Sequence, residues 1–430
     1  MAETLTGTEA YAAEYERVGA SLPGFAALRR RAMDRFRSLG FPTGREEAWR
    51  FTDTAPVAET AFRSAAGTAN PNQFAALARG PLRGCQLAFV DGRFAPAFTQ
   101  LPRGLEAGSL AEALRARSPL LEPRVGTLAA FEDHPFAALN TAFFQDGALV
   151  RVRKGTVLEE PVHLLFLSSF HGDPYVTHPR ILVVLEEGAR ATVVASFLGP
   201  AGGTYLTNAV AELDLGPGAA LDYVKVQRES QAAFHFESLG ARQARGAALA
   251  HHSISLGARL ARNDLSTVLA GEGAECSLLG LYEVSGSQMA DHHTSIDHAA
   301  PEGTSRELYK GILDGRGRAV FDGRIVVRPR AQKTNAVQTN KNLLLSKEAL
   351  VQTKPQLEIL ANDVKCRHGA TIGQLDRDTL FYLRSRGIAE AEARRLLVHA
   401  FASEIVDRVR VDAVRAQIGG CLGLLAPSQP

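Results

Sequence analysis

The chain has 430 residues, a formal net charge of +2 and 45% hydrophobic residues, so it is long enough for two or three domains with a large core. The near balance of basic and acidic side chains excludes the strongly basic surface that is typical of nucleic-acid-binding proteins. Because the sequence contains neither an apolar run of membrane-spanning length nor a basic-then-apolar N-terminal signal, we expect a cytoplasmic protein with no membrane segment.

Residues 1–140 are predicted to form an N-terminal domain that is mainly helical and contains short strands. Between Pro23 and Gly40, apolar residues recur at helical spacing, and these two residues suit the start and the end of a helix. The segment that follows contains the only tryptophan, Trp49. We interpret Trp49 as an anchor that packs the helix onto the next part of the chain; a docking patch for a partner is the alternative.

Residues 141–375 are predicted to form a parallel β-solenoid. Their runs are apolar or alternating, rich in β-branched residues and separated by glycine-containing corners. Gly-Ala pairs recur where several runs begin. Glycine permits the positive φ that a corner requires, and the alanine after it allows successive coils to stack closely. A β-sandwich is the alternative that periodicity leaves open. The pairs are Gly188 with Ala189, Gly218 with Ala219, Gly246 with Ala247, Gly257 with Ala258, and Gly273 with Ala274.

Residues 376–430 are predicted to form a C-terminal helical domain. Asp376 can cap its first helix, Gly387 can end that helix, and a second helix begins near Ala389. One face of the second helix carries an apolar stripe, which we expect to pack partly on the solenoid and to leave the remainder for a partner. The stripe consists of Leu397, Phe401 and Ile405.

The candidate site is the pair Cys366 and His368. Residues i and i+2 of an extended strand project from the same face, so this thiol and this imidazole can approach one metal ion or one sulfur species. Lys365 and Arg367 would then lie on the opposite face. A C-x-H pair is a weak motif by itself, so any bound metal needs further ligands from elsewhere.

A second group of candidate ligands consists of three histidines near two aspartates. These residue types suit zinc or ferrous iron. Neighbouring residues of a strand point to opposite faces, however, so adjacent histidines cannot face one ion without a bulge. We therefore favour hydrogen bonding within polar ladders of the solenoid. The group comprises Asp291, His292, His293, Asp297 and His298.

The sequence contains none of the common catalytic signatures: a phosphate-binding loop, a dinucleotide-binding glycine motif, a nucleophile elbow or a zinc-protease motif. This favours a scaffold over an enzyme. The cysteines lie far apart, which argues against a disulfide framework. Cys276, in an apolar run, is expected to be a small buried hydrophobe, and Cys421 an incidental thiol.

Several long stretches resemble the SufB/SufD family of iron–sulfur cluster assembly proteins, and specifically its SufD branch. Residues 45–52 resemble the N-terminal signature of that family. The other stretches read SRELYKGILDGRGRAVFDGRIVV, AQKTNAVQTNKNLLLS, TKPQLEILANDVKCRHGATIGQLD and LFYLRSRGIAEAEARRLL. The resemblance covers most of the chain and implies a right-handed parallel β-helix between two helical domains.

The resemblance also implies function and partners. It implies a non-catalytic subunit of a SufBCD complex that pairs with SufB through the β-helix, while the C-terminal helices hold the SufC ATPase. The KCRHGATIG motif places at His368 a histidine that the family uses in building the cluster. Where SufB has a cysteine in a segment like TQCDSLLIG, this chain has Asn340, so the principal thiolate is expected from the partner.

The site residues that the resemblance implies fall into three groups. For cluster assembly they are His368, as a metal ligand shared with SufB, and Cys366. For the SufB interface they are Asn340, Lys341, Lys365 and His368. For the SufC interface they are Tyr382, Arg386, Leu397, Phe401 and Ile405.

We expect a transient iron–sulfur cluster at the shared site and no cofactor bound tightly by the isolated chain, while the sequence identifies no flavin site. A homodimer through exposed solenoid edges is plausible when SufB is absent. Two alternatives compete with the scaffold. A carbohydrate-active β-helix lyase or hydrolase would require paired acids in a cleft, and a hexapeptide-repeat acyltransferase would require a regular six-residue period.

Overall fold

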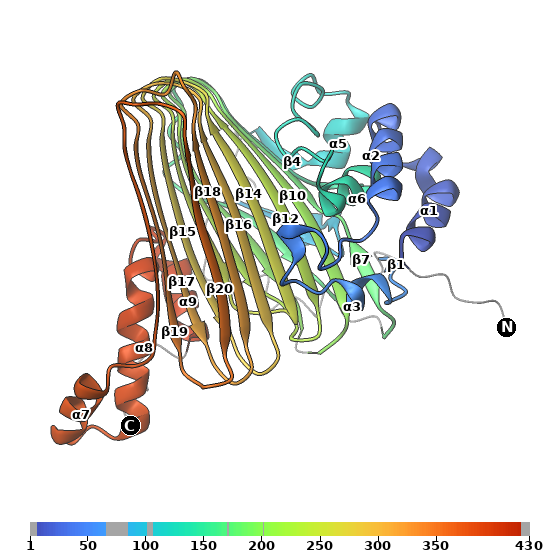
Figure 1. The fold of residues 1–430 in the computed structure, drawn as a ribbon. Helices are drawn as coiled ribbons and strands as arrows, with labels where there is room; N and C mark the ends of the chain where they lie inside the picture. The colour runs from blue at the N-terminus through green and yellow to red at the C-terminus, as the bar shows by residue number, and fades with distance from the viewer. Residues whose placement is uncertain (1–6, 66–84, 101–105, 170–171, 201, 423–430) are drawn as a thin grey trace.

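The computed structural model describes residues 7–65, 85–100, 106–169, 172–200 and 202–422, and its centre is a parallel β-solenoid (Figure 1). Successive strands alternate between two sheets, so each coil contributes one strand to each sheet. This arrangement confirms the predicted solenoid and removes the β-sandwich alternative, because the strands from β5 to β21 pair in parallel with the strands of neighbouring coils.

The first sheet has 11 strands and the second has 10. In spatial order the first contains β20 (Leu350–Ile359), β18 (Arg318–Val327), β16 (Met289–His298), β14 (Leu260–Leu269), β12 (Phe234–Gln243), β10 (Tyr205–Leu215), β8 (Arg180–Leu185), β5 (Gly147–Val152) and β4 (Glu106–Ser109), with β1 (Arg63–Ser64) and β7 (Tyr175–Thr177) beside it. The second contains β21 (Lys365–Gly373), β19 (Asn335–Leu344), β17 (Thr304–Leu313), β15 (Glu275–Val284), β13 (Ala248–Ser255), β11 (Ala220–Arg228), β9 (Arg190–Leu198), β6 (Val162–Leu167), β2 (Cys85–Val90) and β3 (Arg93–Phe94).

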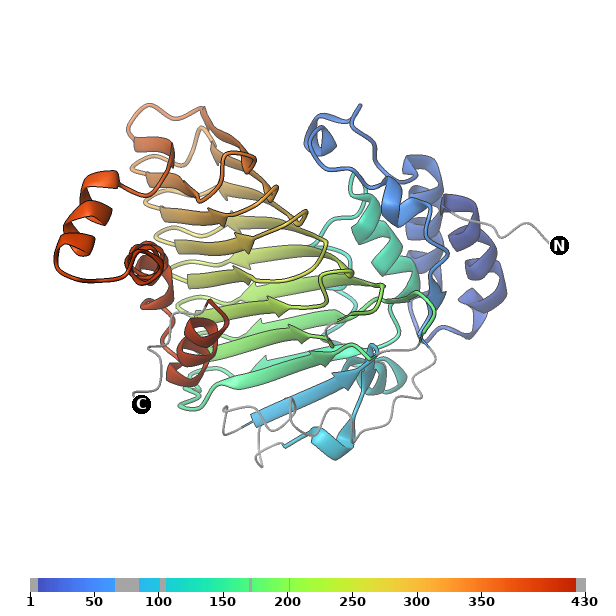
Figure 2. The ribbon, with the colours of Figure 1, turned by 90° about the horizontal axis from the view of Figure 1, so that it is seen from below.

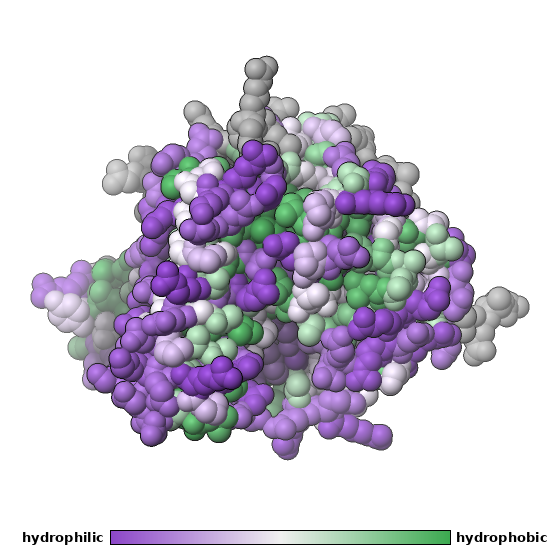
Figure 3. All heavy atoms as spheres, turned by 90° about the horizontal axis from the view of Figure 1, so that it is seen from above, coloured by the Kyte–Doolittle hydropathy of each residue, from purple (hydrophilic) through white to green (hydrophobic). Residues whose placement is uncertain are grey.

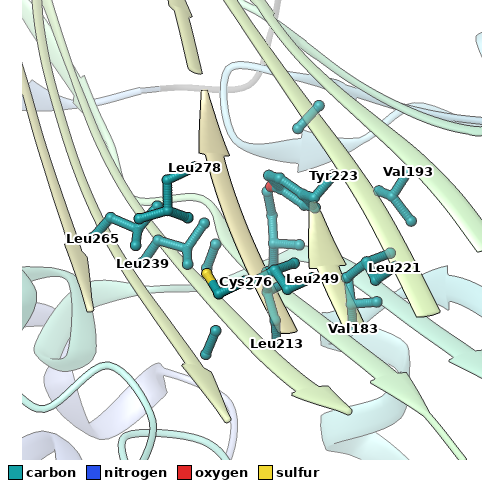
Figure 4. Close-up of a cluster of buried hydrophobic side chains, with 14 of the residues drawn as sticks. Val183, Val193, Leu213, Leu221, Tyr223, Leu239, Leu249, Leu265, Cys276 and Leu278 are labelled. Carbon is teal, nitrogen blue, oxygen red and sulfur yellow. The ribbon is translucent and has the colours of Figure 1, made fainter. Parts of the chain in front are cut away.

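The hydrophobic core fills the space between the two sheets (Figure 4). Side chains such as Leu213 and Leu239 of the first sheet point toward Leu249 and Leu278 of the second. Each such buried side chain contributes about 1.5–3 kcal/mol relative to an exposed one. Cys276 lies within this core and is 3% exposed, and burial raises the pKa of its thiol, as expected for a small buried hydrophobe.

Four of the five Gly-Ala pairs form equivalent corners of successive coils. At Gly188 and Gly218, for example, φ is +68° and +64°, and the alanine that follows each glycine is fully buried. The fifth pair differs, because the positive φ of +70° falls on Ala258. Gly257 is required for another reason: a Cβ there would lie 2.6 Å from backbone atoms of Glu229.

The N-terminal α-helices pack against the outer face of the first sheet, whereas η4 (Pro96–Phe98) packs on the second (Figures 1 and 2). Trp49 is 5% exposed and lies beside the stacked rings of Phe136 and Phe236, with the guanidinium of Arg262 3.6 Å from its ring centroid. Trp49 is therefore an anchor, as predicted. The helical elements are α1 (Gly7–Val18), η1 (Gly19–Ser21), α2 (Ala26–Leu39), η2 (Glu47–Trp49), α3 (Ala55–Ala58), η4 (Pro96–Phe98), α5 (Leu110–Arg115) and α6 (Pro135–Phe143).

The strands of the N-terminal region belong to the solenoid sheets. β2 pairs in parallel with β6, and β4 pairs antiparallel with β5. The predicted boundary at residue 140 therefore separates these strands from the sheets that they extend. Seen from above, the molecule presents mostly hydrophilic residues, with hydrophobic residues gathered toward the middle of the view (Figure 3).

The C-terminal helices are α7 (Arg377–Ser385), α8 (Glu390–Val406) and α9 (Asp412–Cys421). As predicted, Asp376 caps α7, because its Oδ1 accepts a hydrogen bond from the amide of Thr379 at 2.6 Å. Helices α8 and α9 pack on the outer face of the second sheet, whereas α7 projects away from it (Figures 1 and 2). Among the described residues, no helix is long and apolar enough to cross a membrane.

Candidate functional site

The candidate site lies on β21, the second-sheet strand of the last coil. In the parallel register, His368 is the partner of Gln338 on β19, and Cys366 is the partner of Ala336. Gln338 and Ala336 are both fully buried and face the space between the sheets, so Cys366 and His368 also project to that side. The predicted common face of the thiol and the imidazole is confirmed.

His368 is exposed although it projects inward. Each earlier inward residue is covered by the coil that follows it, but β21 and β20 are the terminal strands of their sheets. The backbone edges of these two strands are therefore unpaired within the described chain. Large hydrophobic residues are also uncovered at this open end of the solenoid. They are Ile359, Leu360 and Ile372, which are 40%, 56% and 51% exposed.

Cys366 is less accessible than His368. It is partly buried against the core, and this burial raises the pKa of its thiol, although a backbone hydrogen bond at Ala336 opposes the shift. The thiolate, which is the form that binds metal, is therefore disfavoured at Cys366. Lys365 and Arg367 are exposed on the opposite face, as predicted.

Beneath β21, the buried amides of Asn340 and Asn342 form hydrogen bonds with each other and with the hydroxyl of Tyr282. The Nδ2 of Asn342 donates to Oδ1 of Asn340 at 2.6 Å. The hydroxyl of Tyr282 donates to Oδ1 of Asn342 at 2.6 Å and accepts from Nδ2 of Asn340 at 3.2 Å. Asn340 is 0% exposed. This candidate interface residue therefore supports the open end from within and presents no side chain to a partner.

Lys341 faces the other way from Asn340, toward helix α8. Its Nζ lies 3.3 Å from Oε2 of Glu404, and the Nζ of Lys310 lies 2.7 Å from the same oxygen. The ammonium of Lys310 also lies 4.2 Å from the ring centroid of Phe401. Lys341 thus fixes α8 to the solenoid, while Lys365 stays free of any ion pair that the structure describes.

The predicted apolar stripe of the C-terminal helices divides into two parts. Ile405 is fully buried against the second sheet, and Phe401 packs beside it. Leu397 is only partly buried. Tyr382 is 56% exposed, and the guanidinium of Arg386 lies 5.1 Å from its ring centroid.

Two exposed hydrophobic residues of these helices were missed by the sequence analysis. Phe381 on α7 is 73% exposed and Leu396 on α8 is 42% exposed. The signal that could have identified Phe381 is its place beside Tyr382 in the amphipathic helix α7.

The histidine group on β16 does not converge on one point. His292 points into the core and stacks on Tyr282, with the ring centroids 4.9 Å apart. His293 points outward, where its Nε2 lies 3.0 Å from Oδ1 of Asp291. His298 contacts the hydroxyl of Ser305 at 2.9 Å. Among the described residues, no group of three or more histidine, cysteine or carboxylate side chains could hold a metal ion.

A cleft of about 520 Å³ separates the N-terminal segment from the outer face of the first sheet. Several of its polar side chains are paired with one another: Nε2 of His134 lies 3.1 Å from Oδ2 of Asp264, and Asp322 accepts from Gln356 at 2.7 Å. We therefore interpret this cleft as part of the internal contact between the N-terminal segment and the solenoid.

Comparison with known proteins identifies the family. Residues 168–401 match the model of the SufBD core domain of the SUF system for FeS cluster assembly, and residues 8–164 match the SufBD protein N-terminal region. An iron–sulfur cluster assembly SufBD family protein of Synechocystis is 34% identical over 407 residues, which cover 92% of this chain and 89% of the relative.

Two relatives that carry the name SufD are also similar. The iron–sulfur cluster assembly protein SufD of Escherichia coli is 34% identical over 390 residues, 90% of each chain. The SufD protein of Bacillus subtilis is 27% identical over 296 residues, 67% of this chain and 66% of the relative. These matches confirm the resemblance that the motifs indicated. The chain belongs to the SufBD family of iron–sulfur cluster assembly proteins.

Proposed function

We propose that this chain is a non-catalytic scaffold subunit of the SufD type, which pairs with a SufB chain and carries one side of the site where an iron–sulfur cluster is built. Its similarity to SufD proteins supports this assignment. So does Asn340, which occupies the position where a cysteine is expected in SufB.

The observation that carries the proposal is the uncovered His368 at the open end of the solenoid. A partner that covers this end would bury the edge strands and the exposed residues Leu360 and Ile372, which are costly to leave in water. His368 would then face the partner across the new contact. An imidazole binds iron through one neutral nitrogen, so the remaining ligands must come from that partner.

The cluster is the cargo of this site. Iron–sulfur clusters are held mainly by cysteine thiolates, and the one thiol near His368 belongs to Cys366, where partial burial disfavours the thiolate. We therefore assign the principal thiolate to SufB and the imidazole to this chain. The isolated chain is expected to bind iron weakly.

We assign the C-terminal helices to the SufC ATPase. Helix α8 is fixed to the solenoid by its buried side, while Phe381, Tyr382 and Leu396 remain exposed on α7 and α8. Aromatic residues that project from a rigid support are suited to act as anchors at a protein interface. ATP hydrolysis by SufC would then act on the SufB contact through these helices.

Ile372→Lys tests the proposed SufB contact. We expect the lysine to weaken association with SufB by about 10-fold or more, because a charge replaces an apolar side chain at a contact that excludes water. Association is measured by co-purification with SufB and by titration of the purified chains. Thr371→Lys, on the outer face of the same strand, is the control. Equal binding by both variants and by the native chain would rule out the open end as the contact.

Phe381→Asp tests the proposed SufC contact. The exposed ring makes little contribution to folding, so the variant should unfold like the native chain. Loss of an aromatic anchor typically costs 2 kcal/mol or more, so we expect SufC binding to weaken by about 30-fold. Binding is measured by calorimetry with purified SufC, and Asp378→Ala on the same helix is the control. Unchanged affinity would move the SufC contact away from α7.

A further inference from the structure

Three inward-facing amides of β19 lie directly below the last coil, and one of them differs from the other two. The carboxamide oxygens of Asn340 and Asn342 both accept hydrogen bonds. Gln338 is 0% exposed, and its Nε2 donates to Oε2 of Glu307 at 2.6 Å. Its Oε1, however, has no hydrogen-bond partner. The unpartnered oxygen therefore belongs to the one amide that lies beneath His368.

A buried acceptor without a donor is costly, at about 1–3 kcal/mol. The fold nevertheless makes room for this carboxamide. A Cβ at Gly323, on the facing strand β18, would lie 2.3 Å from Nε2 of Gln338. The glycine thus creates the space into which the amide extends. The side chain is therefore accommodated with its oxygen free to accept one further hydrogen bond.

Glu307 decides which end of the amide is free. Its carboxylate accepts the N–H of Gln338, so the amide is held with its NH₂ group toward Glu307 and its oxygen away from that contact. Glu307, Gln338 and His368 occupy equivalent register positions on β17, β19 and β21. Neighbouring strands lie about 4.8 Å apart, so an imidazole on β21 is within reach of the amide oxygen on β19.

We propose that Gln338 is a positioning residue for His368: when a partner covers the open end, one ring N–H of His368 donates to Oε1 of Gln338, and the other ring nitrogen is left unprotonated and directed at the cluster. This inference rests on the proposed role of His368 as a cluster ligand. Histidines that bind metals generally donate their second N–H to such an acceptor, which fixes the tautomer and the ring orientation. Glu307 acts one step further back, because it orients the amide.

Burial raises the pKa of Glu307 to about 7, yet Oε2 can accept the amide N–H whether the group is charged or neutral. The link from Glu307 to Gln338 therefore requires an acceptor at residue 307 and does not require its charge. Glu307→Gln keeps an acceptor at this place, whereas Glu307→Leu removes it. This pair separates orientation of the amide from simple loss of a buried charge.

The test uses the complete complex with SufB and SufC, loaded with cluster. Two readouts are needed: the resistance of the cluster to a chelator, and the nitrogen hyperfine spectrum of the reduced cluster, which reports the bound imidazole. For Gln338→Leu we expect cluster retention to fall about 10- to 100-fold, the magnitude typical of lost outer hydrogen bonds, with an altered nitrogen signal. Glu307→Leu should behave similarly, and Glu307→Gln should retain the native spectrum.

Asn342→Leu is the matched control, because it removes a buried amide of the same strand that lies beneath Ile372 instead of His368. If Gln338→Leu and Asn342→Leu retain the cluster equally and give the native nitrogen spectrum, while His368→Ala loses the cluster, the inference fails and the proposed function stands. If His368→Ala retains the cluster, the proposed function fails first and the inference fails with it.

Gln338→Leu leaves the carboxylate of Glu307 without its donor and could reduce folding for that reason. The double variant Glu307→Leu with Gln338→Leu replaces both partners by apolar groups, which is often nearly neutral for stability. It should assemble the complex and show the same loss of cluster retention. If every variant at residue 338 fails to assemble with SufB and SufC, Gln338 is a structural residue and the inference is rejected.

Discussion

A SufBCD complex that carries His368→Ala in this chain is expected to assemble normally and to form no stable iron–sulfur cluster. Assembly should be unaffected, because the imidazole is exposed and is engaged in no contact that the structure describes. Cluster formation should fail, because the other side chains that β20 and β21 direct to this face are aliphatic residues, a proline, a threonine and the thiol of Cys366, whose pKa is raised. None of these readily replaces a neutral imidazole as a ligand to iron.

The measurement is anaerobic absorption spectroscopy of the purified complex after reconstitution or co-expression. Thr371→Ala, on the outer face of the same strand, is the matched control and should form the native amount of cluster. Cys366→Ser should retain most of the cluster, because partial burial disfavours the thiolate at that position. An undiminished cluster yield in His368→Ala would exclude this imidazole from cluster assembly.

Arg262→Ala is expected to destabilise the chain by about 3–5 kcal/mol, the cost typical of removing one partner from a buried ion pair. Arg262 is 1% exposed. Its guanidinium donates to Asp264 at 2.8 Å, to Asp291 at 2.6 Å and to the carbonyl of Ala48 at 2.7 Å, and it stacks on Trp49. Its removal leaves Asp264 and Asp291 with only their histidine and threonine partners and also loosens the N-terminal segment.

The loss is measured by urea unfolding at pH 7, with Arg324→Ala as the control. Arg324 pairs with Glu358 at the surface, where ion pairs contribute about 0–1 kcal/mol. A loss below about 1 kcal/mol for Arg262→Ala would show that the buried network has no net role in stability.

The same network predicts a dependence on pH. Burial alone would raise the pKa of Asp264, but Arg262 and His134 outweigh burial and hold that pKa well below its usual value. A carboxyl with a lowered folded-state pKa contributes stability above its unfolded pKa of about 4, and that contribution is lost as the pH falls through the folded value. The variant lacks this contribution, so its acid unfolding should begin at a higher pH than that of the native chain.

The solenoid could be predicted from sequence because its signal is local and repeated. Runs of β-branched residues predict the strands, and corner glycines such as Gly188 and Gly218 predict where the chain turns between them. Both signals lie in the local sequence and do not depend on distant residues. The shared face of Cys366 and His368 followed in the same way from the two-residue period of a strand. The same period places Asn340 on the inner face of β19 with the buried Gln338, and Lys341 on the outer face. The sequence analysis did not apply it to this strand, and so named both Asn340 and Lys341 as interface residues.

The features that were missed depend on contacts between distant segments. Strands β2 and β4 lie far from the predicted solenoid in the chain and join its sheets only through pairing with β6 and β5. Helix α9 lies next to the predicted helices, yet its apolar side is explained only by the outer face of the second sheet. The exposure of Phe381 likewise depends on where α7 lies in space.

The attachment of α8 has a mechanical consequence. Glu404 holds Lys310 of β17 and Lys341 of β19, and Arg394 reaches the carbonyl of Leu345 just after β19. A torque applied to α8 must therefore either break these tethers or drag the strand that underlies the last coil. Helix α8 is therefore rigidly coupled to β19, the strand that lies directly beneath His368.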